Sequence, residues 1–275
     1  MWYLLPVDDK QRRRKEEALA AFDRLIDIID TLRSPEGCPW DRKQTPSSLK
    51  PYIIEEAYEV LDAIDSGQPD HLREELGDLL LQIMLQSQIF HESGQFHVGD
   101  VVDGLSKKMI HRHPHVFGEV QVNGADEVVA NWEKIKAGEK NRRGLFEGVP
   151  AALPALLKSF RMGQKASRVN FDWPDAVQVR AKVVEELAEL DEAIAAGRAG
   201  DIEHELGDLL FAVAQWARHL HCDPEEALRR CCERFELRLS SVQERLHRMD
   251  RSMGDCSLEE LEQLWQDVKR HEQTR

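Results

Sequence analysis

The chain has 275 residues, of which 41% are hydrophobic and 32% are charged, and its formal net charge at pH 7 is −14. This composition supplies both a core and a solvated surface. The acidic excess argues against nucleic acid as a partner, because phosphate backbones bind clustered lysines and arginines. No apolar run approaches the roughly 18 residues of a membrane span, so we expect no membrane partner either.

Cysteine usage indicates the compartment. The count is odd and no Cys-x-x-Cys spacing occurs, which argues against a disulfide framework or a zinc site and favours a reducing environment. The short apolar run near Met1 precedes a basic cluster instead of following one, unlike a signal peptide. We therefore expect a cytoplasmic protein. The cysteines are Cys38, Cys222, Cys231, Cys232 and Cys256.

Apolar residues recur at helical spacing along most of the chain, and alternating runs of β-branched residues, which are typical of strands, do not occur. Glycine, proline and polar residues separate the helical patterns. The sequence therefore predicts an all-α protein. The predicted helices cover residues 11–33, 49–66, 70–92, 98–112, 125–137, 154–169, 175–196, 201–221, 224–249 and 257–273.

An internal repeat divides the chain. Glu-Leu-Gly-Asp-Leu-Leu occurs at residues 75–80 and again at 205–210. Residues 138–153 are rich in glycine, proline and charged side chains, as expected of a linker. The repeat predicts two helical bundles in tandem, with domains at 17–137 and 154–273.

Each half carries acidic residues on two consecutive predicted helices. Residues three apart share one helix face, and a short turn makes consecutive helices antiparallel neighbours, so we expect the acids of each half to converge. The acids are Glu55, Glu56, Glu59, Glu75 and Asp78 in the N-terminal half and Glu185, Glu186, Glu189, Glu205 and Asp208 in the C-terminal half.

The surroundings of these acids favour a site for a hard cation. The second helix of each pair is apolar nearly all round and is expected to be buried, where a carboxylate is costly unless it is protonated, paired or metal-bound. On the first helix the acids lie opposite the apolar side, which a solvated surface explains equally well. With no cysteine nearby and no histidine at ligand spacing, the clusters suit Mg²⁺ or Mn²⁺. A di-iron site would require Glu-x-x-His on two helices, which neither pair has.

This pattern resembles the MazG family of nucleoside triphosphate pyrophosphohydrolases. Its signature is Glu-Glu-x-x-Glu followed on the next helix by Glu-x-x-Asp, and both halves contain it. The stretches CPWDRKQT at 38–45 and HRHPHVFGE at 111–119 resemble further family signatures. The resemblance covers roughly residues 17–273 and indicates the full-length form, with two MazG domains in tandem.

The resemblance implies a homodimer of helical bundles that uses Mg²⁺ to convert nucleoside triphosphates, including deoxy forms, to monophosphates and pyrophosphate. Catalysis is expected in the C-terminal half, where Glu185, like Glu55 in the other half, is left to orient the attacking water. The implied metal ligands are Glu186, Glu189, Glu205 and Asp208 in the C-terminal half and Glu56, Glu59, Glu75 and Asp78 in the N-terminal half.

The family also binds substrate through a basic pair spaced by four residues and through a tryptophan followed four residues later by lysine. The position of Arg234 is typically lysine in the family, so a planar fork replaces a point charge here. Basic residues one helical turn apart can bind the same polyphosphate. The implied residues are Arg234, Arg238, Trp265 and Lys269 in the C-terminal half and Lys108, Arg112, Trp132 and Lys136 in the N-terminal half.

Two other functions are compatible with the same acids. A non-catalytic nucleotide sensor or scaffold would bind metal and nucleotide without turnover. A narrower dUTP- or dCTP-type pyrophosphatase would differ in base specificity. The N-terminal copy is either a second working site or a regulatory or structural remnant.

Overall fold

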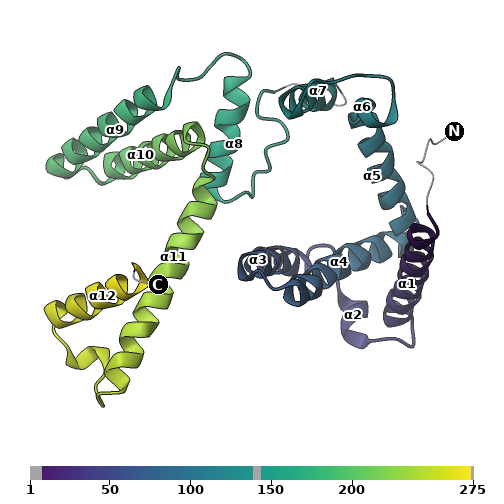
Figure 1. Cartoon of the computed structure of the whole chain (residues 1–275), viewed down its shortest axis with the longest axis horizontal. Coiled ribbons are helices and arrows are strands. Elements are labelled where there is room, and N and C mark those ends of the chain that lie inside the picture. The colour runs from purple at the N-terminus through teal and green to yellow at the C-terminus, as the bar shows by residue number, and fades with distance from the viewer. Residues whose placement is uncertain (1–7, 139–143, 274–275) are drawn as a thin grey trace. The chain divides into compact units, whose positions relative to one another are not determined.

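The computed structural model describes residues 8–138 and 144–273 and is all-α over these ranges, as predicted (Figure 1). None of the described helices combines the length and apolar character that crossing a membrane requires. The chain divides into two compact units, Met1–Asn141 and Arg142–Arg275, each with its own helices. The finer domain limits given above stay a prediction.

The N-terminal unit is organised around the buried residues Ile29, Leu49, Met84 and Leu85. Two of its helices are too short to produce a periodic pattern and were not predicted. Both start at proline, which suits the first helical position because its missing N–H has no partner there. The helices are α1 (Asp9–Arg33), α2 (Pro39–Lys43), α3 (Lys50–Ser66), α4 (Pro69–Glu92), α5 (Val98–Arg112), α6 (Pro114–Phe117) and α7 (Ala125–Gly138).

The C-terminal unit repeats a helical hairpin and adds a second one. Asp175 and Asp223 cap the N-termini of α9 and α11 by accepting backbone N–H bonds. Val242, Leu246 and Val268 form the core between α11 and α12. The helices are α8 (Ala155–Ser167), α9 (Ala176–Ala196), α10 (Ala199–His219), α11 (Pro224–His247) and α12 (Leu258–Gln273), with a 3₁₀ turn at Met253–Asp255.

The two repeated hairpins are built by the same turn. Helices α3 and α9 end at Gly67 and Gly197, which have φ of 65° and 67°. This left-handed conformation favours glycine and reverses the chain within a few residues. As a result α3 packs along α4 and α9 along α10 (Figure 1), which is the antiparallel arrangement that the sequence predicted.

The prediction that α4 and α10 are buried all round is wrong for the described residues of one chain. Ile83 and Leu206 are each 45% exposed, and Leu76 and Leu210 are each 49% exposed. The first helices also expose apolar side chains, including that of Ile54. A two-helix hairpin covers only one side of each helix, so the other apolar side stays at the surface. Each hairpin therefore presents an apolar face.

Candidate active site

The acids of the C-terminal unit converge across the α9–α10 hairpin. Glu186 and Glu189 lie one turn apart on α9, and Glu205 lies in the second turn of α10. One carboxylate oxygen from each of the three lies within 4.8 Å of the others. Glu186 is only 6% exposed. The hairpin thus places three oxygen donors close enough to share one cation.

Charge repulsion is built into this cluster. The pKa of Glu189 is raised by desolvation and then by the neighbouring charges of Glu186 and Glu205, while Lys182 acts in the opposite direction. Like charges at this range disfavour the ionised state of each other. A cation or a proton relieves that repulsion, so the arrangement is suited to cation binding.

The N-terminal unit builds the same cluster on α3 and α4. Carboxylate oxygens of Glu56, Glu59 and Glu75 lie within 4.8 Å of one another. The pKa of Glu56 is raised by desolvation first, and then by the charges of Asp78 and Glu59. Asp78 therefore lies near enough to Glu56 to act on it electrostatically. The sequence repeat therefore produces the same cluster of three carboxylates in both units.

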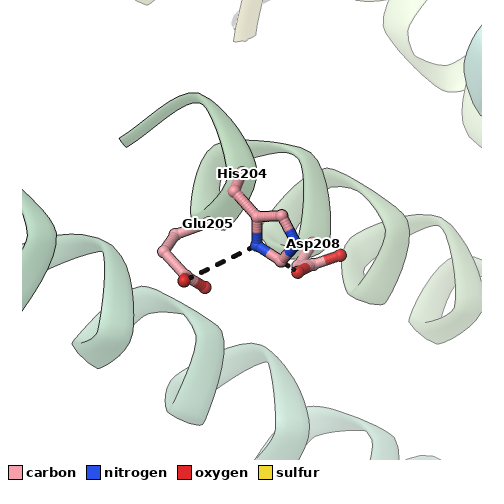
Figure 2. A group of neighbouring side chains, drawn as sticks. All are labelled: His204, Glu205 and Asp208. Atoms are coloured by element: carbon pink, nitrogen blue, oxygen red, sulfur yellow. Dashed lines mark ion pairs between the residues drawn. The ribbon is translucent and has the colours of Figure 1, made fainter. Parts of the chain in front are cut away.

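Asp208 lies with a histidine that sequence reasoning missed. Figure 2 shows His204 and Asp208 on neighbouring turns of α10, with Glu205 beside them. The His204 Nδ1 atom is 3.1 Å from an Asp208 carboxylate oxygen and 3.6 Å from a Glu205 oxygen, and all three residues offer ligand atoms within 4.8 Å of one another. The expectation that no histidine stands at ligand spacing is therefore wrong. The i, i+4 spacing of His204 and Asp208 was the signal, because such residues share a helix face.

A histidine also lies beside an acid in the N-terminal unit, where both residues belong to α4. In α4 the His71 Nε2 atom lies 3.2 Å from a Glu75 oxygen. When the two repeats are aligned, the position that matches His204 holds Glu74 instead. Each unit thus has an imidazole beside one of its acids, but the two histidines do not occupy matching positions of the repeat.

Lys182 is a second residue that the sequence analysis did not single out. Its Nζ lies 2.8 Å from a Glu185 oxygen and 2.7 Å from a Glu186 oxygen. These hydrogen bonds raise the pKa of Lys182 above its usual value. An ammonium group so placed compensates the buried Glu186 carboxylate. The signal was again an i, i+4 pair, Lys182 with Glu186.

The predicted substrate residues of the C-terminal unit meet on the α11–α12 hairpin. The Arg238 guanidinium lies 5.8 Å from the centre of the Trp265 ring, in cation–π range. Its Nη2 atom is also 2.8 Å from a carboxylate oxygen of Glu272. Arg234 is exposed one turn before Arg238, and Lys269 is half-buried one turn after Trp265. Of the four predicted residues, Arg238 and Trp265 are thus in contact, and Arg234 and Lys269 lie one turn away from them on the same two helices.

The N-terminal unit makes the corresponding contact between α5 and α7. The Arg112 guanidinium lies 5.2 Å from the centre of the Trp132 ring. Lys108 is exposed one turn earlier on α5. The side chain of Lys136 lies outside the described residues. Both units therefore pair an arginine with a tryptophan from the next long helix.

Acids and basic residues occupy different hairpins in the C-terminal unit. The α9–α10 and α11–α12 hairpins diverge from the region of α8 (Figure 1). Among the described residues, no hydrogen bond or ion pair joins Arg234, Arg238 or Lys269 to the α9–α10 acids. One chain by itself thus leaves the two groups apart.

The protein thus consists of two all-α units, and in each unit a helical hairpin brings a cluster of carboxylates together. The chain matches the MazG nucleotide pyrophosphohydrolase domain twice, over residues 44–117 and 176–242, and therefore belongs to the MazG family. This confirms the predicted family and the predicted class of enzyme, a hydrolase that acts on phosphoric anhydride bonds. The matched ranges include every predicted acid, but end before Trp132 and Trp265.

Two relatives align with this chain over nearly all of their own lengths. The chain is 41% identical to the nucleoside triphosphate pyrophosphohydrolase/pyrophosphatase MazG of Thermotoga maritima, over 94% of this chain and 100% of the relative. It is also 41% identical to the nucleoside triphosphate pyrophosphohydrolase of Escherichia coli strain K12, over 91% of this chain and 98% of the relative. The crystal structure of a MazG-related protein from Thermotoga maritima is 27% identical, covers 42% of this chain and 97% of its own, and has a TM-score of 0.36.

Proposed function

We propose that this chain is an Mg²⁺-dependent nucleoside triphosphate pyrophosphohydrolase, which converts NTPs and dNTPs to monophosphates and pyrophosphate. The observation that carries the proposal is the convergence of Glu186, Glu189 and Glu205 within 4.8 Å. Membership of the MazG family and the names of the two full-length relatives support the substrate class.

The donor set fits a hard divalent cation. Carboxylate oxygens suit Mg²⁺, with Mn²⁺ as the alternative. The pKa values of Glu56 and Glu189 are raised first by desolvation and then by neighbouring carboxylates, and a bound cation would offset that repulsion. When bound, the metal would supply positive charge that stabilises the phosphates and lowers the pKa of a water molecule. The ligands would be Glu186, Glu189, Glu205 and Asp208 in the C-terminal unit and Glu56, Glu59, Glu75 and Asp78 in the N-terminal unit.

Glu185 is proposed to act on the attacking water. It lies next to the ligand set on α9, and its exposed side chain is held by Lys182. Its carboxylate would accept the proton as the water oxygen bonds to the α-phosphorus and the bond to the bridging oxygen of pyrophosphate breaks. Glu55 occupies the same position in the N-terminal unit.

Basic and aromatic residues are proposed to hold the substrate. Arg234 and Arg238 would neutralise charge that develops on the leaving pyrophosphate. Trp265 offers a stacking plane, and Lys269 offers a further charge one turn away. Lys108, Arg112, Trp132 and Lys136 are the N-terminal counterparts.

The chain is proposed to work as a homodimer in the cytoplasm, without nucleic acid or membrane as a partner. Apolar faces on both hairpins, with Leu206 and Ile83 among the exposed residues, would be covered by a second copy. The separation of the acids from the α11–α12 group gives a second reason to expect help from a partner chain. All five cysteines are free thiols, which suits a reducing compartment.

The test is pyrophosphate release from a panel of NTPs and dNTPs with Mg²⁺, with EDTA as a control. We expect release by the unmodified chain, its abolition by EDTA, and its loss in Glu189→Gln. Binding without release by the intact, folded chain would replace the enzyme with a nucleotide sensor. Release from dUTP or dCTP alone would narrow the substrate class.

A further inference from the structure

The acid cluster of the C-terminal unit includes a nitrogen donor. Two sets of three ligand atoms lie within 4.8 Å of one another there, and Glu205 belongs to both, once with Glu186 and Glu189 and once with His204 and Asp208. Over the described residues of the N-terminal unit, the matching set consists of carboxylates alone. The two clusters therefore differ in the chemistry of their donors, which decides the kind of cation that each prefers.

The His204 imidazole is placed as a ligand would be. Its Nδ1 atom lies 3.1 Å from an Asp208 oxygen and 3.6 Å from a Glu205 oxygen, so the same nitrogen faces both carboxylates (Figure 2). Two ligand atoms that each lie about 2.1 Å from a metal ion are roughly 3.0–3.4 Å apart, at octahedral or tetrahedral angles. One observed separation falls in this range and the other is slightly above it, so only small side-chain adjustments would admit an ion.

This side of the cluster is open to solvent. The side chains of His204, Asp208 and Glu205 are 73%, 49% and 23% exposed, so water molecules can complete the coordination of an ion held by three protein ligands. Among the described residues, the ion pairs of Glu205 and Asp208 are with His204 and not with a lysine or arginine. In contrast, Lys182 binds the carboxylate of Glu186 on α9.

The N-terminal unit has no nitrogen at the matching position. When the repeats are aligned, the position of His204 corresponds to Glu74. His71 does lie beside Glu75, with 3.2 Å between its Nε2 and a carboxylate oxygen, but it belongs to the preceding turn of the helix. Among the described residues, the N-terminal set of three converging ligand atoms does not include it. The nitrogen donor is thus particular to the C-terminal cluster.

A nitrogen donor changes the preference among divalent cations. Carboxylate and water oxygens suit Mg²⁺, which keeps several water ligands when it binds to proteins. Imidazole suits the later first-row transition metals, whose affinity for a given site rises from Mn²⁺ through Co²⁺ to Ni²⁺. One imidazole among carboxylates therefore strengthens the binding of Co²⁺ or Zn²⁺ much more than the binding of Mg²⁺.

We propose that His204 Nδ1 is a metal ligand of the C-terminal cluster, together with Glu205 and Asp208, and that it shifts the preference of this cluster from Mg²⁺ toward divalent transition-metal ions such as Co²⁺ and Zn²⁺. The N-terminal cluster, with oxygen donors, keeps the preference for Mg²⁺. An ion held by His204 uses two of the proposed Mg²⁺ ligands, so the two kinds of ion compete. This inference rests on the proposed binding of a metal by the C-terminal acids.

The experiment titrates the full chain with Co²⁺ in the absence of nucleotide and follows the visible absorption of the bound ion. Co²⁺ is the probe because a thiolate ligand would add a charge-transfer band in the near ultraviolet, which would reveal binding to the exposed cysteines. Mg²⁺ is then added to displace the Co²⁺, and isothermal titration calorimetry gives the affinity for each ion. Circular dichroism verifies the folding of each variant.

We expect His204→Gln to lower the affinity of the tighter Co²⁺ site about tenfold or more and to change the affinity for Mg²⁺ by less than about threefold. His204→Glu, which reproduces the N-terminal residue Glu74, should lower the affinity for Co²⁺ and retain that for Mg²⁺. His71→Gln, which removes the imidazole beside Glu75, is the matched control and should retain both affinities.

Three outcomes would overturn the inference. Equal losses of Co²⁺ and Mg²⁺ affinity in His204→Gln, or no loss of either, would make the imidazole only an ion-pair partner of the acids. A thiolate band at the first equivalent of Co²⁺ would assign the tighter site to cysteine. A loss in His71→Gln as large as that in His204→Gln would remove the difference between the units.

Pyrophosphate release by the unmodified chain with Mg²⁺ is measured in parallel, so that the two proposals can fail separately. Release without the expected effect of His204→Gln on Co²⁺ binding would overturn the role of His204 alone. The expected effect on Co²⁺ binding without release from any nucleotide would support the role of His204 and overturn the proposed hydrolase.

Discussion

The two units place the same acids on the same hairpin and surround them differently. In the C-terminal unit Lys182 bridges Glu185 and Glu186, whereas the matching position of the N-terminal unit holds Tyr52. In the N-terminal unit an amide, Gln82, reaches the cluster, and its counterpart is an alanine. The acids are thus the common part, and the neighbouring residues are where the two copies have diverged in charge and in polarity.

The largest expected effect separates the two units as catalysts. Glu189→Gln should lower the rate of pyrophosphate release by at least about 100-fold, since it removes a proposed metal ligand from the C-terminal cluster. Glu59→Gln, the matched change in the N-terminal unit, should leave most of the rate. Steady-state rates of both variants, with circular dichroism to verify folding, provide the measurement. Equal losses of rate in the two variants would show that catalysis is not confined to the C-terminal unit.

A smaller effect concerns the lysine. Lys182→Met leaves the buried Glu186 without its partner, so we expect the free energy of unfolding to fall by about 1–2 kcal/mol without Mg²⁺, a value reduced from that of a fully buried pair because Lys182 is partly exposed. Tyr52→Met is the matched control and should not produce this charge effect. Urea unfolding with and without Mg²⁺ measures both, and the loss should shrink when the metal is present.

Removing the side-chain amide of Gln82 should raise the stability, whereas Lys182→Met should lower it. Gln82→Leu replaces a buried unpaired acceptor by an apolar group of similar size and also removes the long 3.5 Å contact from Nε2 to Glu56, so we expect a net rise in the free energy of unfolding of at most about 1 kcal/mol in the absence of nucleotide. Urea unfolding is again the measurement. A clear destabilisation would indicate that the amide has a partner in solution and is not an orphan.

The pH dependence of stability should reflect the titration of Glu56 and Glu189. Because the pKa values of Glu56 and Glu189 are raised in the folded chain, the folded state keeps these protons to a higher pH than the unfolded state. Their contribution to stability is present below the unfolded carboxyl pKa of about 4.3 and is lost as pH rises through the folded values. The proposed Mg²⁺ would bind the deprotonated acids, so we expect its stabilising effect to grow as pH rises.

Thermal unfolding at several pH values, with and without Mg²⁺, checks this expectation. The metal-dependent rise in Tm should increase from acidic to neutral pH, and the variant Glu56→Gln should reduce the increase. A metal effect that is independent of pH would mean that protons and Mg²⁺ do not compete for these carboxylates.

Much of this architecture was readable from the sequence, because it depends on local patterns. Helical periodicity located every long helix to within a few residues, and the glycines after α3 and α9 marked the turns that bring the acids together. The short helices α2 and α6 span too few residues to establish a period. The convergence of Glu186, Glu189 and Glu205 followed from spacing on antiparallel neighbours.

The features that were missed depend on surroundings instead of periodicity. An apolar residue such as Leu206 looks buried in the sequence, yet its burial depends on what packs against the hairpin. His204 and Lys182 carry an i, i+4 signal that is common on helix surfaces and gains meaning only beside the acids. The unpaired oxygen of Gln82 is visible only when every neighbour has been placed.

Lys182 has a consequence for how the C-terminal unit responds to its ionic environment. Because it is tethered on the same helix, the Lys182 ammonium group competes with any free cation for the carboxylates of Glu185 and Glu186. A divalent cation that binds Glu186 would have to displace the ammonium group, so binding would be an exchange between an internal and an external cation. If the proposed metal binds there, its apparent affinity for the C-terminal cluster should be lowered by this competition, whereas the N-terminal cluster, with Tyr52 at the matching position, has no such lysine.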